Sequence, residues 1–193
     1  METTVQRIAR VLNVLVLIAL ICNIVILYLV PAAVLSGGPG LLGGVGEYLD
    51  GILHPGNDDI VTAGIAASFL SWFWFWRDAY SLVLTLFLVV SGICTAVILW
   101  QGRRVLGTIL RGEPFSMENA VSLKRAAVCC FMISLAALAR VVFSVIYYAS
   151  PAPLLTYNAL FVPIFAMAGL LCLIMSALFC QAAEMKAEND LTI

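Results

Sequence analysis

Few residues of this chain have types and spacing that could do chemistry. Its only histidine, His54, lies near Asp58 and Asp59, a combination that could bind a metal ion or transfer a proton. A zinc site needs three or four ligands, and the sequence has no second histidine and no Cys-x-x-Cys pair. His54-Pro55-Gly56-Asn57 is instead typical of a turn. We therefore expect no catalytic residue, no metal and no cofactor.

Arg140 is the only residue with a full charge inside a long apolar segment. It lies eight residues before Tyr148, which is roughly 12 Å along a helix at 1.5 Å per residue. An arginine at that depth either extends to the membrane interface or contacts a buried polar group, which would form a ligand site or a helix lock. The candidate partners are Asp78 at the interface and Asn23, Thr85 or Asn158 within the protein.

The amino-acid composition indicates the class of protein that holds these residues. Of the 193 residues, 63% are hydrophobic and 11% are charged. A soluble domain has about 45–50% apolar and about 25% charged residues, so this chain has too few charges to cover a water-facing surface. The net charge of -1 leaves no basic excess that would bind nucleic acid directly. We predict an integral membrane protein whose surroundings are the lipid bilayer.

Four segments are long and apolar enough to span the bilayer, which requires roughly 20 residues per helix. They are residues 11–34, 79–100, 126–148 and 159–181. All are apolar on every side, whereas barrel strands alternate over ~10 residues. The first segment exceeds the usual ~7–15-residue apolar region of a signal peptide, so we expect it to be retained. The predicted fold is an all-α bundle of four transmembrane helices, a single domain over residues 1–193.

The positions of lysine and arginine predict the orientation of this bundle. Eight of these residues precede the first span, lie between the second and third, or follow the fourth. Only Arg77 lies on the opposite side, near five acidic residues. The positive-inside rule therefore places both termini and the loop 101–125 in the cytoplasm.

The outer loop, residues 35–78, has a glycine-rich first half and a more ordered second half. The second half runs from Ile60 to Trp76 and includes Trp72, Trp74 and Trp76. Because tryptophan favours the headgroup region, we predict a short interfacial element anchored by these three rings. A site for lipid or another apolar ligand beside this element is the alternative.

The loop 101–125 has the pattern of a helical hairpin that projects from the membrane. Residues 101–110 extend the second span, Gly112 can end that helix, and Pro114 prevents its continuation. Ser116 is a candidate N-cap for a helix that starts at Met117.

Two motifs resemble a known bacterial membrane family. The turn Gly112-Glu113-Pro114-Phe115-Ser116, followed by Asn119 and Leu123-Lys124, is similar to the central signature of the domain-of-unknown-function 2975 family. The segment from Lys186 to Ile193 resembles that family's "ENDLT" ending. The resemblance covers about the last two-thirds of the chain and implies a multi-pass protein of the bacterial plasma membrane. It implies no activity, but family members are often encoded beside a small helix-turn-helix regulator, which implies a cytosolic partner.

The tail, residues 182–193, has three acidic residues and one lysine, and ends in Leu191-Thr192-Ile193. An apolar-polar-apolar end can add to a sheet edge or enter a carboxylate-binding nest in a partner. It can also fold onto the chain's own arginines, Arg103, Arg104 and Arg111, or fray without function. The candidate partner-binding residues are Glu188, Asn189, Asp190, Leu191, Thr192 and Ile193.

Taken together, these patterns favour a non-enzymatic regulatory or scaffolding protein that binds a cytosolic partner through its hairpin and tail. The alternative is a small transporter or a protein that binds lipid or an apolar ligand through Arg140 and the aromatic outer element. A charge-lined cavity around Arg140 would favour the alternative. A tightly packed bundle with an ordered tail would favour the regulatory protein.

Overall fold

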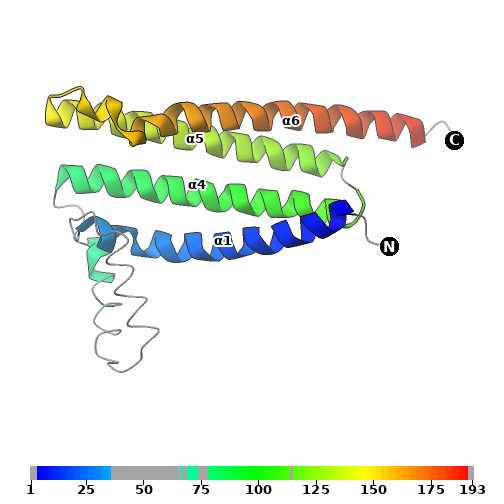
Figure 1. Ribbon diagram of the computed structural model, residues 1–193, viewed down its shortest axis with the longest axis horizontal. Coiled ribbons are helices and arrows are strands. Elements are labelled where there is room, and N and C mark those ends of the chain that lie inside the picture. The colour runs from blue at the N-terminus through cyan, green and yellow to red at the C-terminus, as the bar shows by residue number, and fades with distance from the viewer. Residues whose placement is uncertain (1–3, 36–65, 67–68, 74–77, 114, 191–193) are drawn as a thin grey trace. The chain divides into compact units, whose positions relative to one another are not determined.

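The computed structural model describes residues 4–35, 66, 69–73, 78–113 and 115–190. Within these ranges the chain forms helices and no strand. The long helices are α1 (Thr4–Leu35), α4 (Ala79–Leu110), α5 (Met117–Tyr148) and α6 (Phe161–Asp190), and two short 3-10 helices, η2 (Ala152–Leu155) and η3 (Tyr157–Leu160), connect the last two (Figure 1). The predicted all-α class is confirmed.

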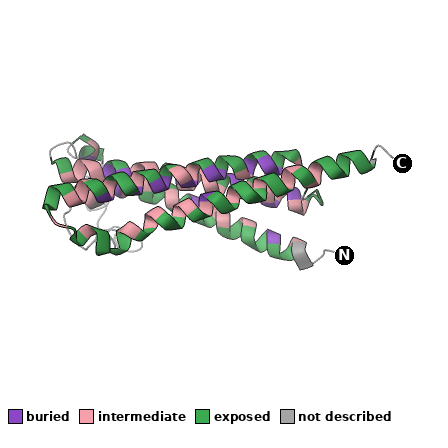
Figure 2. Ribbon diagram, turned by 90° about the horizontal axis from the view of Figure 1, so that it is seen from above, coloured by how far each residue is buried: buried purple, intermediate pink, exposed green. Residues whose placement is uncertain are grey.

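Four of the described helical stretches are long and apolar enough to cross a membrane. Many of their large apolar side chains are exposed, and exposed residues run along the helices in Figure 2. A protein in water rarely exposes so much apolar surface, whereas lipid tails are the surroundings that suit it. The chain is therefore a multi-pass membrane protein.

The fourth apolar stretch, Tyr157–Asn189, includes the predicted start at residue 159 but begins with a 3-10 turn before the α-helix. Residues Tyr157–Leu160 form η3, and the α-helix starts at Phe161. Pro163 explains the difference, because it has no N–H to bond to the carbonyl four residues earlier, at Ala159. An α-helix that began at residue 159 would lack this first-turn hydrogen bond.

Contacts divide the chain into two compact units, Ile24–Val90 and a second that joins Met1–Asn23 to Ser91–Ile193. In the first, the Trp72 indole N–H donates to the Tyr28 carbonyl at 3.3 Å, and the Phe69 ring meets the Tyr28 ring edge-on, with 5.5 Å between centroids. Trp72 thus attaches its segment to α1. Trp74, Trp76 and most of the outer loop lie outside the described residues, so their interfacial role stays a prediction.

In the other unit, α5 and α6 lie side by side and antiparallel (Figure 1). The buried face of α5 consists mainly of small residues three or four apart, which let two helix backbones approach closely. Hydroxyl groups connect the pair: Ser134 Oγ donates to the Val162 carbonyl at 2.8 Å, and Ser176 Oγ donates to the Ala120 carbonyl at 2.7 Å. This pairing fixes the N-terminal end of α5 against the C-terminal half of α6.

Candidate functional site at the α4–α5 turn and the end of α6

The turn after α4 is built around Gly112, which has a φ of +83°. The Gly112 N–H donates to the Ile109 carbonyl at 3.1 Å, and the Glu113 N–H donates to the Thr108 carbonyl at 3.0 Å. These two bonds are those of a Schellman motif, which satisfies the last carbonyls of a helix and places glycine in the left-handed region. The predicted helix end at Gly112 is confirmed. Pro114 lies outside the described residues.

Helix α5 starts at Met117 with Ser116 as its N-cap, as the sequence predicts. The Ser116 backbone is extended, and its Oγ accepts a hydrogen bond from the Asn119 N–H at 3.4 Å. Glu118 occupies the first turn, where the positive end of the helix dipole favours a carboxylate. The end of α4 is therefore capped by the backbone N–H groups of Gly112 and Glu113, and the start of α5 by the Ser116 side chain.

A buried polar pair, Thr108 and Asn119, connects α4 to α5 just beyond this turn. The Asn119 Nδ2 group donates to Thr108 Oγ1 at 2.7 Å, and the Thr108 hydroxyl lies 2.7 Å from the Val105 carbonyl, which can accept its proton. Asn119 is fully buried and Thr108 nearly so. The sequence interpretation missed this pair. Each residue lies two positions from its helix end, and that symmetry about the turn is the signal that could have revealed it.

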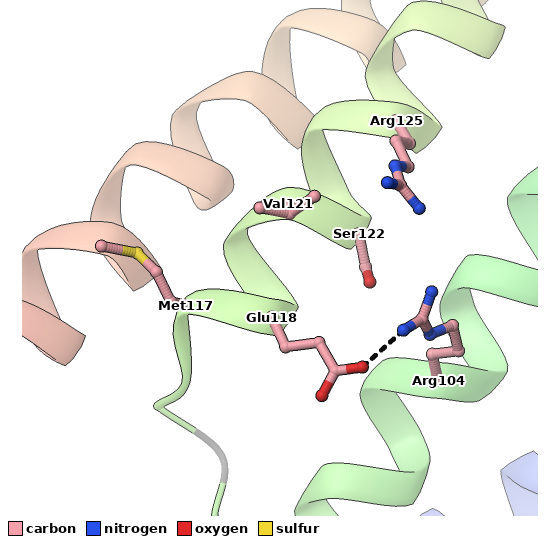
Figure 3. Close-up of a pocket in the computed structure, with 6 residues that line it drawn as sticks. All are labelled: Arg104, Met117, Glu118, Val121, Ser122 and Arg125. Atoms are coloured by element: carbon pink, nitrogen blue, oxygen red, sulfur yellow. Dashed lines mark hydrogen bonds and ion pairs between the residues drawn. The ribbon is translucent and has the colours of Figure 1, made fainter.

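An ion pair forms the water-facing edge of the hairpin. Arg104 Nη2 lies 2.5 Å from Glu118 Oε1, and both side chains remain about half exposed, at 42% and 52%. This pair borders an open pocket of about 330 Å³ (Figure 3). The neighbouring Arg103 donates from Nε to Asn13 Oδ1 of α1 at 3.3 Å, which joins the start of the chain to the same end of the unit.

The turn also packs against α6. The Phe115 and Phe179 rings lie 5.8 Å apart between centroids, and the Cys180 thiol lies 3.6 Å from the Met117 sulfur. Together with the hydrogen bond from Ser176 to α5, these contacts join the hairpin to residues 176–180 of α6, which directly precede its last turns.

The described part of the tail continues α6 as a helix as far as Asp190. Glu188 and Asn189 are exposed, while Leu191, Thr192 and Ile193 lie outside the described residues. Residues 182–190 are therefore helical and neither fray nor fold back at residue 182, which were two of the alternatives for the tail. The helix follows from the composition of the segment, which is rich in alanine, glutamate and lysine and lacks glycine and proline. Strand addition by the last three residues stays a prediction.

Arg140 lies far from this surface. It is half-buried on α5, and its backbone carbonyl accepts a hydrogen bond from Ser144 Oγ at 2.9 Å. The Asn23 Oδ1 atom is buried and accepts no hydrogen bond from a described residue, so Asn23 is not the acceptor for the Arg140 guanidinium. In the part of the chain that the structure describes, no group of three or more His, Cys, Asp or Glu residues is placed to hold a metal ion.

The profile of a family described as "Protein of unknown function (DUF2975)" matches residues 58–193. The chain belongs to this family. The DUF2975 match includes α4, α5 and α6 and both motifs, whereas α1 and the glycine-rich part of the outer loop precede it. No curated protein and no solved structure matches the chain.

Proposed function

We propose that this DUF2975 protein is a non-enzymatic membrane anchor that binds a cytosolic regulatory protein through the α4–α5 turn and the C-terminal end of α6. The observation that carries the proposal is the packing of the turn on α6 through Phe115, Phe179, Met117 and Cys180. These contacts attach the turn to residues 179 and 180 of α6, which directly precede the exposed end of that helix. A prepared surface of this kind lowers the ordering cost of binding a partner.

The chemistry of the α6 end supports a protein partner. The helix runs nine residues beyond residue 181, the predicted end of the span, which is about 14 Å at 1.5 Å per residue. Its exposed side chains include the acidic residues Glu184 and Glu188 and the apolar residue Met185. An apolar anchor with flanking carboxylates complements a partner surface that has an apolar pocket with a basic rim.

The proposal includes the orientation of the protein in the membrane. Eight lysines and arginines lie before the first span, between the second and third or after the fourth, against Arg77 alone in the outer loop, which supports a cytoplasmic location for this surface. The DUF2975 resemblance supports a small helix-turn-helix protein as the partner class and the bacterial plasma membrane as the location.

Site-specific photocross-linking tests the proposal. A photoreactive amino acid at Met185 should form an adduct with a cytosolic protein in intact cells. The matched control is Leu171 on the same helix, because both side chains are 63% exposed and only Leu171 lies within the predicted span. An adduct at Met185 and none at Leu171 supports docking at the α6 end. Protein adducts at neither position would contradict it.

The alternative is transport or apolar-ligand binding around Arg140. Arg140 lies 15 residues beyond Arg125 on α5, which is about 22 Å along the helix. The pocket beside Arg104 and Glu118 is therefore not a part of an Arg140 site. The alternative predicts that Arg140→Leu abolishes function while partner cross-linking at Met185 stays unchanged.

A further inference from the structure

The pocket at the hairpin has a composition suited to a phosphate group. It is lined by Arg104, Met117, Glu118, Val121, Ser122 and Arg125 and has a volume of about 330 Å³. At ~30 Å³ per water molecule this is the space of about ten waters, enough for a phosphate with part of a glycerol unit. Figure 3 shows the Arg104 and Arg125 guanidinium groups directed toward the same space, beside the Ser122 hydroxyl.

The electrostatic balance in this pocket favours an anion. Two arginines face one carboxylate, and the pocket adjoins the first turns of α5, whose N-terminal end carries a partial positive charge. The carboxylate of Glu118 pairs with Arg104, and the pair is exposed on both sides. An exposed ion pair contributes little stability, so a doubly coordinated phosphate can displace Glu118 from Arg104.

The position of the pocket along the helices matches the level of lipid headgroups. Arg125 directly precedes residue 126, where the predicted third span begins, and Arg104 lies one helical turn beyond residue 100, where the second ends. Trp100 is exposed beside that boundary, as expected for a residue of an interfacial aromatic belt. Met117 and Val121 line the part of the pocket that lies further from the span than Arg125.

We infer that this pocket binds the phosphate of an anionic glycerophospholipid, with Arg104 and Arg125 contacting the phosphate oxygens and Glu118 acting as the counter-ion that the lipid displaces. The site is independent of the protein partner proposed above, because both arginines and the lipid act without it. Basic pockets between helices at the charged side of a membrane bind anionic headgroups by the same chemistry.

Native mass spectrometry of the full-length protein in detergent tests this inference. The probes are dioleoylphosphatidylglycerol, dioleoylphosphatidylcholine and free glycerol 3-phosphate. The variants are R125Q, the double variant R104Q/R125Q, and E118Q. The matched controls are R111Q and E113Q, which make the same charge changes at exposed positions of the same turn outside the pocket.

The expected loss of phosphatidylglycerol affinity is about fivefold for R125Q and about 25-fold for R104Q/R125Q, since one basic residue near anionic lipid contributes ~1 kcal/mol. E118Q should bind more tightly than the parent protein. R111Q and E113Q should match the parent, and phosphatidylcholine should bind weakly to all. Because R104Q also removes an ion pair, far-UV circular dichroism checks the fold of the double variant, and R125Q leaves that pair intact.

Equal losses in R111Q and R125Q would overturn the inference, since binding would then follow surface charge alone. If glycerol 3-phosphate at equal concentration displaced all bound phosphatidylglycerol, the phosphate bound in the pocket would not need to come from a lipid, which would overturn the inference. Unchanged or weaker binding in E118Q would contradict the displacement of Glu118.

Discussion

The buried pair of Thr108 and Asn119 allows a quantitative test of how the hairpin is held together. We consider the variants T108V, N119A and T108V/N119A. Valine has nearly the shape of threonine without the hydroxyl, so T108V leaves the Asn119 amide donor buried without its 2.7 Å acceptor. N119A removes the amide and leaves a space at a position that is 0% exposed.

The expected magnitudes follow from the location of the pair. Thr108 lies eight residues beyond residue 100, about 12 Å outside the predicted span, so the values measured in soluble proteins apply. T108V should cost about 0.5–1.5 kcal/mol, the net contribution of one intramolecular hydrogen bond. N119A should cost about 2–3 kcal/mol, because a cavity adds to the lost hydrogen bond. The double variant should be less destabilised than the sum by about 0.5–1.5 kcal/mol, since the hydrogen bond between the two residues is lost only once.

Thermal unfolding in detergent, monitored by circular dichroism, measures these values as shifts of Tm. A matched control is T156V, since Thr156 donates from Oγ1 to the Pro153 carbonyl at 2.6 Å but is exposed. It should change the free energy of unfolding by less than about 0.5 kcal/mol. Strictly additive effects of T108V and N119A would refute the interpretation that these two residues stabilise the hairpin through each other.

Three further predictions concern the backbone of the hairpin, the α5–α6 pair and the orientation. G112A should lower the free energy of unfolding by about 1–2 kcal/mol, because Gly112 has a positive φ that alanine adopts only with strain. G102A should raise the free energy of unfolding by ~0.5–1 kcal/mol, because Gly102 lies in the interior of α4 and an added Cβ would meet open space. Equal effects of the two variants would contradict the Schellman motif. G169A should destabilise by about 1–3 kcal/mol because its Cβ would lie 3.0 Å from the Phe131 ring, and F131L should reduce that loss; no reduction would place the strain elsewhere. A cysteine at Ser116 should react with maleimide only from the cytoplasmic side, and labelling from outside would reverse the proposed orientation.

The sequence contains most of the information on the helices and on the turn that joins α4 to α5. Apolar length predicts four spans, because a helix in lipid needs little more than a sufficient run of apolar residues. Gly112 and Ser116 predict helix ends because their preferences act through local backbone geometry. Each of these features depends on neighbours in sequence, and the structure confirms four long apolar helices and both helix ends at the turn.

The contacts between helices could not be predicted from the sequence. Arg104 pairs with Glu118 across a turn, and Phe115 meets Phe179 on another helix; neither pair follows a helical spacing. Such contacts depend on how far each helix is rotated about its axis, and segments that are apolar on all sides give little indication of that rotation. The helical tail was not predicted either, although the alanine, glutamate and lysine residues of this segment favour a helix.

Deletion of residues 189–193 tests most directly the proposal that the α6 end is a recognition surface for a cytosolic protein. Capture of soluble proteins by the membrane-embedded chain is quantified for the full-length protein, for the deletion and for D190K. We expect normal insertion of every variant, loss of the captured partner in the deletion and weaker capture by D190K. Undiminished capture of the same partner by the deletion and by D190K would contradict the claim.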